Sequence, residues 1–323
     1  MIKNSRSKLV SVIFPTLDRE KALIFSLKDI LAQNYQRLEI IVADQTEVPS
    51  KKVLEFCEIH RDKIKYLHLK EKGSPNARNV AVKEAKGEIL FFFDDDIKIE
   101  NSDLISDHLK NYEDVKVGLV GGRVLDDLDA KPSGDATTGR LKFWGLKKIT
   151  HFDSTKRQEI DHAPGGNMSV KKSIFKKVGG YKTLYPGNAH LEETDFSLRV
   201  KRAGYKLVFE PKAVLRHLHF VHGGNRVKDI YALRYWIAHN YIIFELENYG
   251  KLPTAILAVR QICWGLLSSI KRGELKMFKT MFSATINGYR YYRKQVYTKP
   301  TAVKDTDLDF PSEEIGSKRS ARL

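Results

Sequence analysis

The chain has 323 residues, of which 42% are apolar and 30% charged, and its formal net charge at pH 7 is +16. The length predicts one large domain or two smaller ones with a proper core, and the charge favours acidic partners such as nucleotides, nucleic acid or an anionic membrane surface. The two cysteines, Cys57 and Cys263, lie far apart, which argues against a disulfide framework and fits a reducing compartment.

The first eight residues are polar and lead directly into an apolar run, so we expect no signal peptide. No clean apolar run reaches the length of a membrane-spanning helix. We therefore expect a cytoplasmic protein.

The first half of the chain alternates predicted strands with predicted helices. Apolar runs predict strands at residues 9–14, 38–43, 64–69 and 89–93. Pro15 is expected to end the first strand and Asp18 to cap the next helix, whose apolar face includes Leu23 and Leu27. Pro75 suits the first turn of a later helix. This alternation is typical of an α/β fold, in which a mostly parallel sheet has helices on both faces.

Three adjacent carboxylates, Asp94, Asp95 and Asp96, follow the fourth apolar run directly. That run reads as a central strand that is buried on both faces. Adjacent carboxylates repel one another and raise one another's pKa values unless a cation lies among them. Hard oxygen ligands of this kind suit Mg²⁺ or Mn²⁺, which usually hold substrate phosphates as well. The sequence therefore favours a metal and diphosphate site, against the alternative of a solvated acidic turn.

Other polar groups follow the predicted strands at the same edge of the sheet, at residues 16–20, Asp44 and residues 73–79. Ligands of open α/β sheets bind at this edge. Asp44 can accept a hydrogen bond from a base or a ribose, and Arg78 can meet a base carbonyl or a phosphate. Each group also has a structural interpretation, but together they indicate a bound nucleotide. The glycine-rich signatures of dinucleotide-binding and P-loop proteins are absent from the sequence.

The second half is less regular, with a further strand at residues 117–122 and a long polar loop at 125–160. Gly165 and Gly166 allow a ligand to approach the backbone closely, with a tight turn into an edge strand as the alternative. Two short strands are predicted at residues 205–210 and 213–216.

A helix is predicted from Glu192 to Ala203, followed by the stop signal Gly204. Glu192 and Glu193 suit the positive end of the helix dipole, but a carboxylate at the lip of a nucleotide cleft can also act as a general base. His217 ends a strand and is a metal candidate. We expect the nearby His219 and His222 to be ordinary surface or core residues.

In the C-terminal third, the sequence pattern predicts a helix at residues 229–248 and a further helix that Pro253 can open. An apolar stripe at helical spacing runs through the second of these helices: Leu252, Ile256, Val259, Cys263, Leu266 and Ile270. Residues 251–300 carry ten Lys or Arg residues against Glu274 alone. This basic amphipathic segment, with Trp264 and Phe278, either lies on an anionic membrane face or packs on the catalytic domain or on a second subunit. Arg260 and Gln261 argue against a membrane span, and residues 301–323 have the composition of a disordered tail.

These segments, in this order, resemble the family 2 glycosyltransferases, which have the GT-A fold. The resemblance covers roughly residues 8–225 and rests on the ordered set of motifs rather than on any one of them. The motifs include residues 12–19, 41–44, 73–79, 92–96, 166–169, 179–181, 192–199, 204–205 and His217.

The resemblance implies a role for each motif residue. Donor-nucleotide contacts would come from Pro15, Thr16, Arg19, Glu20, Asp44, Arg78, Asp94 and Asp95. Asp94–Asp96 would be the DxD-type motif, whose Asp96 would bind the metal, and His217 would complete the metal or diphosphate site. Acceptor contacts would come from Gly165, Gly166, Asn167, Glu192 and Asp195. The catalytic base would be Glu193, where the family usually has the Asp of a Glu-Asp pair.

The resemblance further implies a catalytic domain at 1–225, with a donor-binding half at about 8–122 and an acceptor half at about 123–225. A helical extension at 226–300 and the tail follow it. The expected activity is metal-dependent, inverting transfer of a sugar from a UDP- or dTDP-sugar to a saccharide or lipid-linked saccharide. Bacterial members suggest cell-surface polysaccharide or lipopolysaccharide assembly at the inner face of the membrane, without a nucleic-acid partner. The alternatives are a nucleotidyltransferase that makes a nucleoside-diphosphate sugar and, prompted by the charge, a basic nucleic-acid-binding protein.

Overall fold

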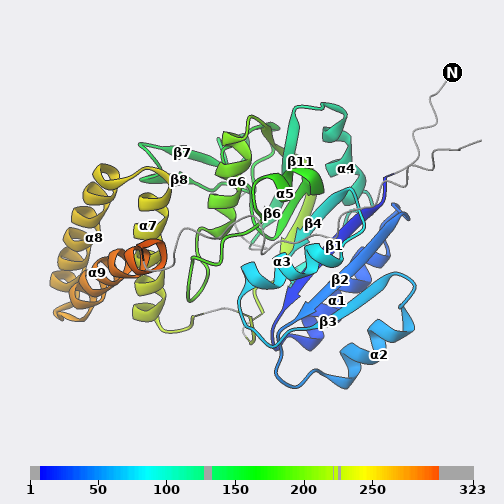
Figure 1. Ribbon diagram of the computed structural model, residues 1–323, viewed down its shortest axis with the longest axis horizontal. Helices are drawn as coiled ribbons and strands as arrows, with labels where there is room; N and C mark the ends of the chain where they lie inside the picture. The colour runs from blue at the N-terminus through cyan, green and yellow to red at the C-terminus, as the bar shows by residue number, and fades with distance from the viewer. Residues whose placement is uncertain (1–7, 127–132, 221, 225–226, 298–323) are drawn as a thin grey trace, which may run out of the picture.

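The computed structural model describes residues 8–126, 133–220, 222–224 and 227–297 (Figure 1). A nine-stranded sheet has the order β3-β2-β1-β4-β10-β6-β11-β5, with β9 paired to β11. Its strands are β1 (Val10–Thr16), β2 (Leu38–Asp44), β3 (Ile64–His68), β4 (Ile89–Phe93), β5 (Ile97–Lys98), β6 (Val117–Leu125), β9 (Gln158–Glu159), β10 (Asn167–Lys171) and β11 (Lys206–His217). A separate hairpin consists of β7 (Arg140–Lys142) and β8 (Lys147–Ile149).

Helices cover both faces of the sheet, as the alternating pattern predicts. On one face lie α1 (Glu20–Leu31), α2 (Lys51–Ile59) and α4 (Leu104–Lys110), the last followed by a short 3₁₀ turn, η1 (Asn111–Glu113). On the other face lie α3 (Ser74–Glu84), α5 (Lys172–Lys177) and α6 (Glu192–Arg202). Successive side chains of β1 alternate between the two cores, with Val12 and Phe14 in the first and Ile13 in the second. The predicted α/β class is confirmed.

Strand β10 lies in the middle of the sheet, antiparallel to both β4 and β6. The alternative of an edge strand after Gly165 and Gly166 is therefore wrong. Because β10 runs against its neighbours, it begins at the edge where the parallel strands end. The two glycines consequently lie near the carboxylates that follow β4.

Two local predictions near the first strand are wrong. Pro15 lies inside β1, opposite Ala43 of β2, and is tolerated there because the pairing of β1 with β4 ends at Ile13. Asp18 does not cap α1. It has a left-handed backbone, with φ of 54°, and its N–H donates to Thr46 Oγ1, while Arg19 takes the capping position.

The second half contains more strand than its polar sequence indicates. The two short strands predicted at 205–210 and 213–216 form the single strand β11, with a register irregularity between Glu210 and Val214. The segment predicted as a loop at 125–160 contains β7, β8 and β9 among its described residues. These strands bring the loop segment into the body of the protein.

The C-terminal helices α7 (Ile230–Asn248), α8 (Lys251–Arg272) and α9 (Lys276–Tyr297) form a bundle beside the sheet domain (Figure 1). Helix α7 is capped by Asp229, which accepts from the Ala232 N–H. It docks on the sheet domain through polar contacts, since Asn240 donates to the Pro186 carbonyl and Asn248 donates to Asp195. The predicted tail at 301–323 lies outside the described residues.

The apolar stripe of α8 faces outward, so the alternative in which this stripe packs on the catalytic domain is wrong. The helix instead buries its opposite side, which consists of Pro253, Thr254, Leu257, Gln261, Gly265 and Ser269. The small residue Gly265 explains this choice, because a Cβ there would lie 2.8 Å from Met281 of α9. Among the described helices, α8 is long and apolar enough to cross a membrane by length and composition, and a third of its most apolar window is buried.

Candidate active site

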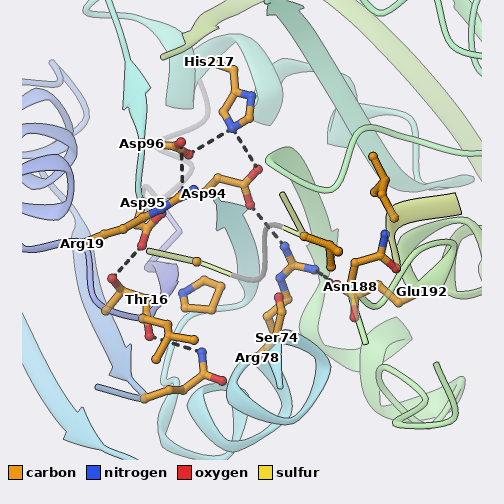
Figure 2. Close-up of a pocket in the computed structure, with 16 residues that line it drawn as sticks. Thr16, Arg19, Ser74, Arg78, Asp94, Asp95, Asp96, Asn188, Glu192 and His217 are labelled. Atoms are coloured by element: carbon orange, nitrogen blue, oxygen red, sulfur yellow. Dashed lines mark hydrogen bonds and ion pairs between the residues drawn. The ribbon is translucent and has the colours of Figure 1, made fainter. Parts of the chain in front are cut away.

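A cleft of about 460 Å³ opens where β1 and β4 end (Figure 2). Nine residues expected to serve donor, metal or acceptor line it: Pro15, Thr16, Arg19, Arg78, Asp94, Asp95, Asp96, Glu192 and His217. They come from both halves of the chain, because Asp94–Asp96 follow β4 while His217 ends β11. The pairing of β5 with β11 sets Ile97 opposite His217. Residues far apart in sequence therefore meet in one cleft.

Asp94, Asp96 and His217 converge on one point of this cleft. His217 Nε2 lies 3.0 Å from Asp96 Oδ1 and 3.8 Å from Asp94 Oδ2. The Asp96 side chain is fully buried, whereas that of Asp94 is 37% exposed. Burial alone would lower the pKa of His217, but hydrogen bonds with Asp126 and Asp96 and the Asp94 charge raise it to about 10. A protonated imidazole thus supplies the positive charge among these carboxylates in the ligand-free protein.

The donor set at this point fits a divalent metal. Two carboxylates and an imidazole nitrogen suit Mg²⁺ or Mn²⁺. Asp126 and His219 extend the set. One ligand atom from each of Asp126, His217 and His219 lies within 4.8 Å of the other two. Asp126 was not among the predicted site residues, and His219 was expected to be an ordinary surface or core residue. His219 lies two positions beyond the strand in a left-handed backbone conformation, with φ of 51°, and nothing in its local sequence marks it.

Asp95 lies at the edge of the cleft, nearly buried, and its carboxylate holds Thr16 of β1 and Arg19 in place. Its carboxylate accepts from Thr16 Oγ1 at 2.6 Å and from Arg19 Nη1 at 2.7 Å. Burial raises its pKa to about 6, although Arg19 and Thr16 act in the opposite direction. Arg19 also reaches Asp96 Oδ2 at 3.0 Å. Asp95 therefore positions Arg19 and leaves Asp94 as the exposed member of the acidic triplet.

A smaller hollow adjoins the cleft and shares Thr16 and Arg19 with it. Its lining includes Glu20, Asp44 and Val48. Asp44 is buried, and its two oxygens accept from the Thr46 N–H and the Tyr66 hydroxyl, each at 2.8 Å. A Glu20 oxygen accepts from the Ser50 hydroxyl.

Arg78 lies in the cleft itself and not in the hollow beside Asp44. Its guanidinium is buried, 2.5 Å from Glu192 Oε1 and 3.4 Å from Asp94 Oδ1. Its Nε and Glu192 Oε2 are both buried without a hydrogen-bond partner. A cation beside the acidic triplet suits a phosphate better than a base.

Glu192 and Glu193 have different environments, although they are adjacent at the start of α6. Burial raises the pKa of Glu192 to about 8 against the opposing charge of Arg78. Burial acts in the same direction on Glu193, but the Lys148 ammonium, 3.5 Å away, acts together with His190, a backbone hydrogen bond and Arg78 to hold the Glu193 pKa below its ordinary value. Glu193 is thus the carboxylate that is ionised at neutral pH in the ligand-free protein.

Gly165 and Gly166 leave the space in which these groups meet. A Cβ on Gly166 would lie 2.3 Å from Asp94 Oδ2, and one on Gly165 would lie 3.3 Å from the Glu193 Cβ. Each glycine therefore determines the position of a different functional carboxylate.

Two residues expected to contact the acceptor are structural. Asn167 is fully buried, where its amide donates to the Arg123 and Ala213 carbonyls and so ties the start of β10 to β6 and β11. Asp195 is also fully buried, and its oxygens are occupied by Arg199 and Asn248. Both sit in motifs with functional neighbours, which is why their polar side chains were misinterpreted. The sequence interpretation also missed the cleft residues Leu17, Gln45, Ser74, Asn188, Gly224, Val227 and Leu233.

The sequence that builds this cleft matches a known family over half of the chain. The model of the family described as glycosyl transferase family 2 matches residues 11–179. The chain belongs to glycosyl transferase family 2. Membership of this family makes the protein a transferase. It favours the glycosyltransferase hypothesis over the nucleotidyltransferase and nucleic-acid-binding alternatives.

Curated relatives of the enzyme include glycosyltransferases of lipid-linked sugars. The glucosyl-dolichyl phosphate glucuronosyltransferase of Haloferax volcanii is 26% identical over 218 residues, which are 64% of this chain and 68% of that protein. The Escherichia coli enzyme named UDP-Glc:alpha-D-GlcNAc-diphosphoundecaprenol beta-1,3-glucosyltransferase WfgD is 38% identical over 97 residues, 29% of this chain and 37% of that protein. Three relatives match this chain over about two thirds of its own length. The matched region makes up between about a quarter and two thirds of the length of those relatives.

Solved structures support the GT-A fold. The mannosyltransferase PcManGT from Pyrobaculum calidifontis, in complex with GDP-Man and Mn²⁺, aligns with a TM-score of 0.56 and 17% identity over 92% of this chain and 89% of that one. GalNAc-T7 with UDP, GalNAc and Mn²⁺ aligns with a TM-score of 0.63 and 14% identity over 92% of this chain and 59% of that one. The predicted fold is thereby confirmed.

Proposed function

We propose that this family 2 enzyme transfers a sugar from a UDP- or dTDP-sugar to an acceptor hydroxyl, with inversion at the anomeric carbon and with the help of Mg²⁺ or Mn²⁺. The convergence of Asp94, Asp96 and His217 on one point of the cleft carries the proposal. These residues would hold the metal, which when bound would offset the charge of the leaving diphosphate. The Mn²⁺ in both structural neighbours supports a divalent ion.

The donor would lie across the cleft and the hollow. Its base would occupy the hollow beside Asp44 and Glu20, and Thr16 and Pro15 would line the path to the diphosphate. Arg78 would add positive charge where the diphosphate meets the sugar, since it is buried beside Asp94. Residues 8–122 would thus form most of the donor half, and residues 123–225 the acceptor half.

Glu193 would act as the general base. Its lowered pKa keeps the carboxylate ionised at neutral pH, and it adjoins Gly165 on the side of the cleft formed by the second half of the chain. Removal of the acceptor proton while that oxygen attacks from the opposite face would give inversion in a single displacement, with an oxocarbenium-like transition state. Glu192, held by Arg78, would orient the acceptor or the diphosphate.

The acceptor would be a saccharide carried on a lipid phosphate, and the reaction would serve surface polysaccharide assembly at the inner face of the cell membrane. The support comes from relatives named for dolichyl phosphate and diphosphoundecaprenol acceptors. The excess of positive charge in the C-terminal helices is also suited to an anionic lipid acceptor.

Thermal unfolding in the presence of UDP, dTDP, GDP or ADP, each with and without Mn²⁺, tests the donor assignment. A ligand at a hundred times its dissociation constant stabilises a protein by about 2.7 kcal/mol. We expect a shift with one pyrimidine nucleotide that requires the metal. No shift with any nucleotide, or a shift that ignores the metal, would overturn the metal and donor assignment while leaving the family membership intact.

A further inference from the structure

Helix α8 presents a continuous apolar surface that no described part of the chain covers. The α8 face consists of Leu252, Ile256, Val259, Cys263, Leu266, Leu267 and Ile270, whose exposures include 70% for Leu252, 63% for Val259 and 68% for Ile270. Their spacing of three and four residues aligns them along one side of the helix. Exposed patches of this kind mark interaction sites in soluble proteins.

A second element adds aromatic side chains beside this helix. The tip of the β7–β8 hairpin exposes Phe143 by 70% and Trp144 by 59%. Both have a left-handed backbone conformation, with φ of 52° and 53°, which is unusual for bulky residues and indicates a function when it occurs. Figure 1 shows the hairpin reaching toward the end of α8.

The hairpin tip is fixed to the bundle. Gly145 leaves no room for a Cβ, which would lie 2.6 Å from the Tyr249 ring of the segment between α7 and α8. Arg260 of α8 donates to the Leu146 carbonyl at 2.7 Å. The hairpin tip and the α8 face are therefore parts of one packed unit.

Positive charges surround both elements. Lys142 and Lys147 flank the hairpin tip, and Lys251, Lys271 and Arg272 lie at the ends of α8, all of them exposed. Arg234 of α7 stacks on Trp264 at 5.2 Å beside the same helix and forms no ion pair among the described residues.

We propose that the hairpin tip and the α8 face dock together on an anionic lipid bilayer. The apolar residues would enter the boundary between headgroups and acyl chains, with α8 parallel to the membrane plane, and the cations would meet lipid phosphates. Trp144 and Trp264 suit the headgroup level, where amphipathic rings are enriched. The bilayer is complementary in charge, whereas a second copy of this chain would bring cations against cations.

The same geometry argues against α8 as a membrane span. A span would expose its whole circumference to lipid, but α8 uses one side to pack on α7 and α9. That side contains Thr254, Gln261 and Ser269, and Gln261 donates to the Ala238 carbonyl of α7 at 3.1 Å. Only the outward side of α8 is free to meet a membrane.

Vesicle flotation of the full chain tests the proposal without an activity readout. The protein is mixed with phosphatidylcholine vesicles that contain or lack one third phosphatidylglycerol, at low and high salt. We expect it to float with the anionic vesicles alone and to be released by salt. The variants Phe143→Ser/Trp144→Ser and Val259→Ser/Leu267→Ser should each weaken partitioning by about tenfold or more.

The control is the variant Ile59→Ser/Val115→Ser, which removes side chains that are 75% and 79% exposed elsewhere on the molecule and should float like the parent. The proposal is overturned if the protein ignores anionic vesicles, or if the control loses as much binding as the two test variants. It is also overturned if sedimentation finds a dimer that the α8 substitutions dissociate, or if alkaline carbonate fails to release the protein from native membranes, as expected for a span.

Discussion

Lys148 of β8 lies within 3.5 Å of Glu193 at the start of α6. The same ammonium donates to Thr194 Oγ1 at 3.0 Å, so it is held at the start of α6. This ion pair helps to distinguish two neighbouring carboxyl groups: the pKa of Glu193 lies below its ordinary value, whereas burial raises the pKa of Glu192 to about 8. Two adjacent carboxyl groups thus have pKa values shifted in opposite directions.

The Glu193→Gln variant should retain donor binding and lose transfer by a factor of about 10²–10⁴, the usual value of general-base help. Steady-state transfer assays and nucleotide-induced thermal shifts measure the two properties separately. The matched control is Glu192→Gln, whose parent carboxyl has a raised pKa and accepts from Arg78, and whose loss should cost less in turnover. Parental turnover in the Glu193 variant would assign the base to another residue.

The Asp96→Asn variant should lose the stabilisation that the nucleotide gives with Mn²⁺. Asp96 is the buried carboxylate nearest His217, and an amide is a weaker ligand for a hard cation. Calorimetric titration of Mn²⁺ and of the nucleotide measures the loss. Unchanged metal affinity would remove Asp96 from the metal site.

Alanine substitutions at Gly165 and Gly166 should affect different properties, one mainly turnover and the other mainly donor binding. Gly166→Ala places a Cβ 2.3 Å from Asp94 Oδ2, so Asp94 must move and metal-dependent donor affinity should fall. Gly165→Ala crowds Glu193 at 3.3 Å, so turnover should fall more than donor affinity. Both neighbours are side chains that can shift, and both variants should therefore fold. Equal effects of the two substitutions on affinity and turnover would contradict this division.

The Glu245→Gln variant should flatten the loss of stability that accompanies a rise in pH from acidic values to about 8. Glu245 of α7 is fully buried with both oxygens unpaired, and burial raises its pKa to about 8. The unfolded state ionises near pH 4.3, so the parent loses stability as the pH rises from there to about 8, by as much as a few kcal/mol. Melting temperatures measured from pH 5 to 9 should show that the melting temperature of the variant rises relative to that of the parent as the pH increases. Parallel curves would mean that Glu245 has a partner.

The sheet and the acidic triplet were predictable because their signals are local. Each strand is an apolar run, and Asp94, Asp95 and Asp96 follow one directly. The separate roles of the three were not predictable, since they depend on which carboxylate meets Thr16, Arg19 or His217 across the sheet. For the same reason the sequence does not reveal that Asp126 and His219 lie close to His217.

The partner of the α8 apolar stripe was not predictable from the sequence. A stripe at helical spacing fits a packed core as well as a membrane face, and the sequence left both interpretations open. The helix packs through its other side, where the small residues Gly265 and Ser269 allow α9 to come close. The side of α8 that is buried is thus decided by how closely the helices can pack, which hydrophobic periodicity does not measure.

Asp96 and His217 are 121 residues apart in the chain, which has a consequence for the order of folding. A nascent chain that has emerged as far as β6 already contains the triplet but lacks the imidazole that lies against it. His217 arrives only when β11 pairs with β5, among the last events in the assembly of the sheet. Closing so long a loop is slow and costly in entropy. An ion that binds at this seam would fasten the late strands to the early ones, so that the competence to bind donor and the completion of the fold coincide.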